Sequence, residues 1–298
     1  MNSEHLAHLQ QVIADYGRDY GRDYARYSAE ELWRLALGDR HHVTELLQMQ
    51  MPLSQRRELY VTAAELSLVL AWTAGDRGQV RAALAYAADA RYHATEAGHS
   101  EAVAWAFDVE ATTWLYDDQP DHALRAAAQG VTVAPPGSAA QTRLTGQVAR
   151  IHARLRHADQ AVDALALLRV QAERHEEHAA GLFSADVARA WSVAATSHLW
   201  LGQDEQARDF ATQASRLYER DRQASPTRWG ITLLDLGTAC ARLGDLEEAV
   251  AHGLAAVSVP RYSAAIVTRS GSLGALLERR YPNAAVVERF RRRLVELQ

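Results

Sequence analysis

The chain has 298 residues, a formal net charge of −5 and 48% hydrophobic residues, which predicts a globular rather than a disordered protein. Its mild acidity argues against direct nucleic-acid binding, which normally requires a basic surface. A single cysteine excludes an intrachain disulfide and a multi-cysteine zinc site. The sequence contains no apolar export signal and no run of about 18 apolar residues that could span a bilayer, so we expect a cytoplasmic protein.

Residues 1–57 are predicted to form a helical arm or cap. A short helix is expected near residues 4–15, followed by a link in which Tyr16, Tyr20 and Tyr24 recur every four residues. Two further helices are expected between residues 28 and 51. Ser28 and Glu31 have the spacing of a capping box at the start of the first of these two. Such an arm would cover the exposed end of a repeat array.

An imperfect internal repeat follows. In five places a small or polar turn leads, after three variable residues, to a small or β-branched residue that opens an apolar helix. These opening positions are Val80, Ala123, Ala161, Ala207 and Ala249, at spacings of 43, 38, 46 and 42. The position twelve residues upstream of each is occupied by Leu68, Ala111, Ala149, Ala195 and Gly237. Four of these five residues are small, as close packing of two antiparallel helices requires.

Sustained period-two alternation is absent from the sequence, whereas helical spacing is widespread, for example at Leu233, Leu236, Gly237 and Cys240. The sequence therefore predicts an all-α fold.

The last full unit, residues 233–260, resembles a tetratricopeptide repeat. Leu236-Gly237, Gly244-Asp245, Ala249, Ala256 and Pro260 fall at or within one residue of the signature positions of that motif. The resemblance extends over residues 58–260. It implies a right-handed superhelical solenoid of about five helix pairs, closed by helices within residues 261–298.

The arrangement as a whole is similar to the C-terminal sensor region of actinobacterial helix-turn-helix transcriptional regulators. Residues 1–57 show no helix-turn-helix pattern, so the DNA-binding module of that family is absent from this sequence. The chain is then either a piece of a longer regulator or a free-standing repeat protein.

The resemblance also implies a concave groove, because the first helix of each pair lines the inner wall of such a solenoid. Carrying over the register of the motif gives the expected groove residues. They are Glu65, Trp72, Trp105, Asp108, Thr112, Tyr116, Arg143, Arg150, Arg154, Arg189, Ser192, Thr196, Trp200, Thr238 and Arg242, with Val69 and Thr73 as further positions.

The arginines in this set suit a carboxylate or phosphate, since a guanidinium offers two parallel donors. The tryptophans and Tyr116 would add flat apolar walls. We therefore expect the groove to bind a peptide, a protein segment or a small anionic ligand, without a cofactor.

Catalytic and metal-binding signatures are weak. The sequence has no nucleophile elbow, phosphate-binding glycine loop or dinucleotide fingerprint, so an enzyme is not expected. His175 and His178 are three residues apart with Glu176 and Glu177 between them, but no ligand from a separate element is indicated, and no metal site is predicted. Cys240 is expected to be a buried, inert thiol. Besides a binding protein, an accessory enzyme that uses the groove as its active site and a structural homodimer remain as hypotheses.

Overall fold

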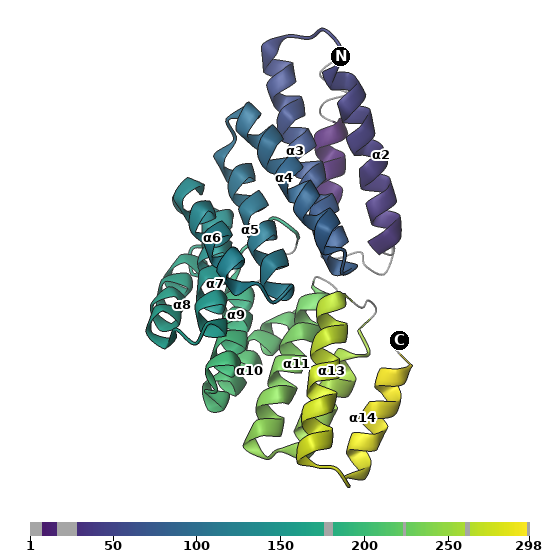
Figure 1. Ribbon diagram of the computed structural model, residues 1–298, viewed down its shortest axis with the longest axis vertical. Coiled ribbons are helices and arrows are strands. Elements are labelled where there is room, and N and C mark those ends of the chain that lie inside the picture. Colours follow the sequence, from purple (N-terminus) through teal and green to yellow (C-terminus); the bar gives the residue numbers. More distant parts are fainter. Residues whose placement is uncertain (1–7, 17–28, 176–180, 223–224, 260–262, 297–298) are drawn as a thin grey trace. The chain divides into compact units, whose positions relative to one another are not determined.

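The computed structural model describes residues 8–16, 29–175, 181–222, 225–259 and 263–296 (Figure 1). Within these ranges all regular structure is helical, which confirms the predicted all-α fold of consecutive helix pairs. The capping residue Ser28 and most of the tyrosine-rich link lie outside the described residues. None of the helices described is both long and apolar enough to cross a membrane.

Two compact units make up the chain. Unit 1 comprises residues 1–148 together with residues 180–184, and unit 2 comprises residues 149–179 and 185–298. The short segment 180–184 thus belongs to unit 1 although it follows residues of unit 2. The domain boundaries expected from the sequence, at residues 57 and 260, stay predictions.

Unit 1 begins with helical residues 8–16 and continues as successive helices. They are α2 (Ala29–Leu47), α3 (Leu53–Asp76), α4 (Val80–Ala97), α5 (Ser100–Tyr116), α6 (Pro120–Val133) and the first part of α7 (Ala139–Arg154). From α2 to α6, each helix packs against the next. The expectation of two helices between residues 28 and 51 is wrong. The Gly38-Asp39 pair lies inside one continuous helix, where the Cα of Gly38 faces open space.

Unit 2 continues the same pattern to the end of the chain. It holds the rest of α7 and the helices α8 (Ala158–Ala172), α9 (Val187–Leu201), α10 (Asp204–Arg220), α11 (Pro226–Leu243), α12 (Leu246–Ala256), α13 (Ala264–Arg280) and α14 (Ala285–Val295). The last two are the closing helices that the sequence predicts after residue 260.

Small residues mark where the two helices of each pair touch. Ala111, Ala149, Ala195 and Gly237 are all buried, as are the partner positions twelve residues later, Ala123, Ala161, Ala207 and Ala249.

In the first pair, however, the register is shifted by three residues from the expected one. The equivalent residues are Ala71 and Ala83; Leu68 is buried as well, but Val80 is only half-buried whereas Ala83 is fully buried. In this pair, as in the others, the second residue closes the first helical turn, with Ala83 N–H bound to the Gln79 carbonyl.

A partly buried polar network connects α2 to the first helix pair. Arg40 donates to Ser67 Oγ at 2.9 Å and to Asp89 Oδ2 at 2.8 Å, and Ser67 donates to the same carboxylate at 2.5 Å. Burial alone would raise the pKa of Asp89. The hydrogen bonds from His93 and Ser67 and the charge of Arg40 outweigh it and hold that pKa well below its usual value. Three helices thus share one ionised carboxylate.

Candidate functional site

The predicted site residues of unit 1 converge on the guanidinium of Arg143. Its carbon lies 5.0 Å from the ring centroids of both Trp72 and Trp105, close enough for a cation–π interaction with each. The same guanidinium donates to Asp108 Oδ2 at 2.5 Å. Asp108 is fully buried and only 6% of Arg143 is exposed. α3, α5 and α7 thus each contribute to one buried ion pair lined by indoles.

Asp108 is further held by a glutamine that the sequence reasoning missed. Gln147 donates to Asp108 Oδ1 at 2.7 Å, so both carboxylate oxygens accept a hydrogen bond. The same amide lies 2.5 Å from Thr112 Oγ1, one turn further along α5. We call Trp72, Trp105, Asp108, Thr112, Arg143 and Gln147 the unit 1 cluster. Since Asp108 neutralises Arg143, this cluster has no net charge to offer an anion.

A loop segment from between α8 and α9, residues 181–184, lies on the unit 1 cluster. The carbonyl of Leu182 accepts a hydrogen bond from Arg143 at 2.9 Å. The side chain of Leu182 is 3% exposed and packs with Val69 and Leu70 of α3. The ring of Phe183 meets Trp105 edge to face, at a centroid distance of 5.5 Å. The protein therefore places its own apolar segment on the residues that were predicted to bind a ligand.

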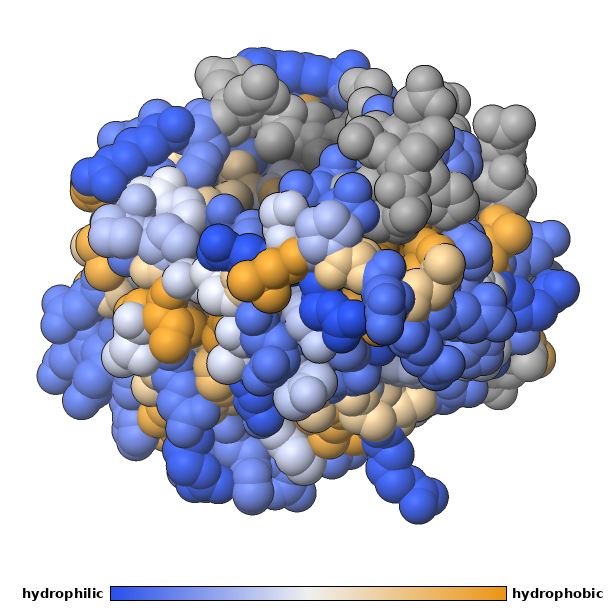
Figure 2. Space-filling view, turned by 90° about the horizontal axis from the view of Figure 1, so that it is seen from above, coloured by the Kyte–Doolittle hydropathy of each residue, from blue (hydrophilic) through white to orange (hydrophobic). Residues whose placement is uncertain are grey.

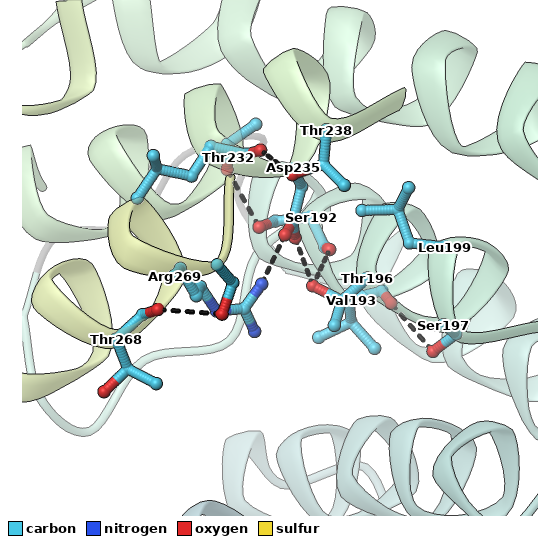
Figure 3. A network of polar contacts seen from close by, with 12 residues as sticks. Ser192, Val193, Thr196, Ser197, Leu199, Thr232, Asp235, Thr238, Thr268 and Arg269 are labelled. Atoms are coloured by element: carbon cyan, nitrogen blue, oxygen red, sulfur yellow. Dashed lines mark hydrogen bonds and ion pairs between the residues drawn. The ribbon is translucent and has the colours of Figure 1, made fainter. Parts of the chain in front are cut away.

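Unit 2 contains a second buried carboxylate network (Figure 3). Asp235 of α11 accepts hydrogen bonds from Thr196 of α9 and from Arg269 of α13. Beside it, the hydroxyls of Ser192 and Thr232 lie 2.8 Å apart. These five residues form the unit 2 cluster, which ties three helices together as the unit 1 cluster does.

The two clusters have the same arrangement of side chains, although sequence reasoning predicted only some of the residues that form them. In each, a buried aspartate on the first helix of a pair is bound by an arginine in the second turn of a following helix. Ser192 and Thr196 were predicted, but Asp235 and Arg269 were not. The sequence did contain a signal for Asp235, because this aspartate lies inside the apolar run of residues 233–236. A charge buried in such a run needs a partner of opposite charge.

The other predicted residues have different surroundings. Arg242 binds the Leu199 carbonyl at 2.9 Å and Asp204 at 3.1 Å, and Thr238 donates to the carbonyl of Leu234. Tyr116 and Arg154 are exposed, while Arg150, Arg189 and Trp200 are half-buried. For these positions a role in ligand binding stays a prediction.

Glu65, the remaining predicted residue, has an unusual environment on α3. Burial, followed by the negative charge of Glu101, raises the pKa of Glu65 to about 7. A carboxyl group with a pKa this high keeps its proton to a much higher pH than an ordinary glutamate does.

Hydrophilic residues dominate the molecular face shown in Figure 2, and apolar residues appear there in small separate groups. Such scattered apolar residues are normal on a protein surface. The argument for a binding site therefore depends on the clusters rather than on a broad apolar patch.

Comparison with known proteins supports the fold. Among solved structures, the chain is similar to BtubC from P. vanneervenii, with a TM-score of 0.55 and 16% identity over 87% of this chain and 95% of that one. It is also similar to a Rap protein complexed with competence and sporulation factor, with a TM-score of 0.57 and 12% identity over 98% of this chain and 91% of that one. No protein-family model and no curated protein matches the sequence. The consecutive helix pairs and the similarity to these solved structures together show a tetratricopeptide-like helical repeat fold.

Proposed function

We propose that the chain is a regulatory or adaptor protein whose unit 1 cluster binds an apolar protein segment in an extended or turn conformation. The observation that carries this proposal is the docking of residues 181–184 on Arg143 and Trp105. In this view the loop segment is an intramolecular occupant, and a partner segment binds by replacing it.

The contacts of the loop segment define the chemistry of the partner. Arg143 binds a backbone carbonyl, Val69 and Leu70 contact a branched aliphatic side chain, and Trp105 contacts an aromatic ring. Because Asp108 neutralises Arg143, a neutral carbonyl suits this position better than a phosphate. The cluster therefore favours a protein segment over a small anionic ligand.

The structural neighbours fit a binding role. The Rap protein was solved in complex with the competence and sporulation factor, so a protein of this fold holds a bound factor. The resemblance to the sensor regions of transcriptional regulators adds a role in regulation. Exchange of an internal segment for a partner would be the step that such a regulator senses.

Peptide binding tests this proposal. The ligand is a synthetic peptide of residues 180–187, and the control peptide has alanine in place of Leu182 and Phe183. The protein variant Leu182→Ser with Phe183→Ser leaves the cluster without its internal occupant. We expect the peptide to bind this variant at least about tenfold more tightly than the wild type, because a tethered segment competes at an effective millimolar concentration.

Isothermal titration calorimetry gives the affinities, and circular dichroism verifies that the variant keeps its helices. The control peptide should not bind either protein. A folded variant that does not distinguish the two peptides, or binds neither, would contradict the proposal.

A further inference from the structure

A cysteine, a glutamate and a histidine converge in the last repeat of unit 2. Cys240 is on α11, and Glu248 and His252 are on α12. Their possible ligand atoms all lie within 4.8 Å of one another, and Cys240 Sγ is 3.7 Å from Glu248 Oε2. In the part of the chain that the structure describes, this is the one such group of three.

The helix pair brings these side chains together for clear structural reasons. Glu248 and His252 are four residues apart, so they lie one above the other on the same face of α12. Gly237 allows α11 to approach that face closely, since a Cβ at this position would lie 2.9 Å from the Ala249 carbonyl oxygen and 3.5 Å from the Cβ of His252. Cys240, one turn after Gly237, therefore faces the two α12 side chains.

The donor set matches the preference of one class of metal ion. Thiolate, imidazole and carboxylate are the three side-chain ligands of zinc in proteins. In a tetrahedral zinc site the sulfur and oxygen ligands are separated by about 3.6 Å, given bonds of about 2.3 and 2.1 Å. The separation of 3.7 Å between Sγ and Oε2 is already close to this distance.

The surrounding charges also favour a cation. Glu219 of α10 acts on His252, and Asp245 acts on Cys240. Arg208 opposes them, but Asp245 partly compensates it at a distance of 3.3 Å. Cys240 is buried, His252 is half-buried and Glu248 is exposed. A metal held by the three ligands would thus keep a coordination position open to water on the exposed side.

We propose that Cys240, Glu248 and His252 form a three-ligand site for zinc, with water as the fourth ligand. The sequence reasoning missed it because Cys240 belongs to a different helix from the other two ligands, which look like ordinary surface residues of α12.

Metal binding at this site would be coupled to proton release. Burial and the neighbouring carboxylates raise the pKa of Cys240 to about 11. The thiol therefore keeps its proton until a metal replaces it, with release of that proton to the solvent.

Cobalt binding to the chelator-treated full-length chain tests the site. We expect one Co²⁺ per chain, a thiolate-to-cobalt charge-transfer absorption band, and loss of the band when Zn²⁺ is added. Cys240→Ser should abolish the band. Glu248→Gln and His252→Gln should each weaken binding by more than about tenfold, the smallest loss usual even for groups outside the first coordination sphere.

His198→Gln is the matched control. His198 is a half-buried histidine of unit 2 that stacks on Phe210 and does not belong to the proposed zinc site. Glu248 and His252 are not fully buried, so their variants should remain folded even if Cys240→Ser does not. Absence of the band in the wild type overturns the proposal. A band that persists unchanged in both α12 variants also overturns it, since the thiol would then bind cobalt without the other two ligands.

Discussion

At the scale of single residues, the ion pair between Asp108 and Arg143 connects stability with the proposed binding face. Both side chains are buried, so removal of either leaves the other charge without compensation. We expect Asp108→Asn and Arg143→Met each to lower the free energy of unfolding by about 3 to 5 kcal/mol. The double variant should lose less than the sum of the two.

Urea denaturation measures these values. The matched control is the half-exposed pair of Arg91 and Glu110, also in unit 1 and 2.6 Å apart. There Glu110→Gln should cost less than about 1 kcal/mol. Strictly additive losses at Asp108 and Arg143 would show that the two residues are not coupled.

Glu65 gives a prediction about pH. Its pKa is about 7 in the folded chain against 4.5 for an unperturbed glutamate, so the folded protein retains a proton that the unfolded chain releases. Its favourable contribution is complete below pH 4.5 and disappears as the pH rises through 7. Glu65→Gln should therefore leave stability unchanged near pH 4 and raise it near pH 8, by on the order of 1 to 3 kcal/mol.

Thermal unfolding of the wild type and the variant at several pH values measures this effect. Glu101→Gln should produce a smaller gain, because the charge of Glu101 is the lesser of the two causes. An equal effect of Glu65→Gln at both pH values would refute the explanation.

At the scale of helices, the small residues at the pair contacts are what holds the repeat together. Gly237→Ala would place a Cβ 2.9 Å from the Ala249 carbonyl oxygen, a backbone atom that cannot move without shifting α12. We expect a loss of about 1 to 3 kcal/mol in the free energy of unfolding.

Gly271 is the matched control, because it lies inside α13 and a Cβ there meets nothing within 4 Å. Gly271→Ala should stabilise the protein by up to about 1 kcal/mol, since alanine loses less entropy in a helix. Denaturation midpoints of the two variants that move in the same direction would contradict this account of the helix contact.

The helices also show which contact positions a sequence pattern can predict and which it cannot. In four of the five helix pairs the sequence predicted the correct contact positions, because close packing requires alanine or glycine there and these residues are visible in the sequence. The first was misplaced by three residues, since Leu68 and Val80 are as compatible with a helix as Ala71 and Ala83. In the structure Leu68 and Ala71 are both fully buried, so the register is distinguished on α4, where Ala83 is buried and Val80 is not.

At the scale of the whole molecule, sequence reasoning selected residues that lie together in unit 1 but did not predict the segment that packs on them. Trp72, Trp105, Asp108 and Arg143 were predicted as a binding wall, and the structure does bring them together. The docking of Leu182 was not predictable, because a loop far along the chain carries no periodic signal for its tertiary contacts. That loop changes the interpretation from an open groove for a peptide, a protein segment or a small anionic ligand to a face already occupied by an apolar segment of the chain itself.

The most direct measurement is a crystal structure of the Leu182→Ser, Phe183→Ser variant with the peptide of residues 180–187. The account predicts peptide density on the unit 1 cluster, with a backbone carbonyl at Arg143 and the phenylalanine ring against Trp105. Density elsewhere on the protein, or an empty cluster at saturating peptide, would contradict the claim that this face binds protein segments.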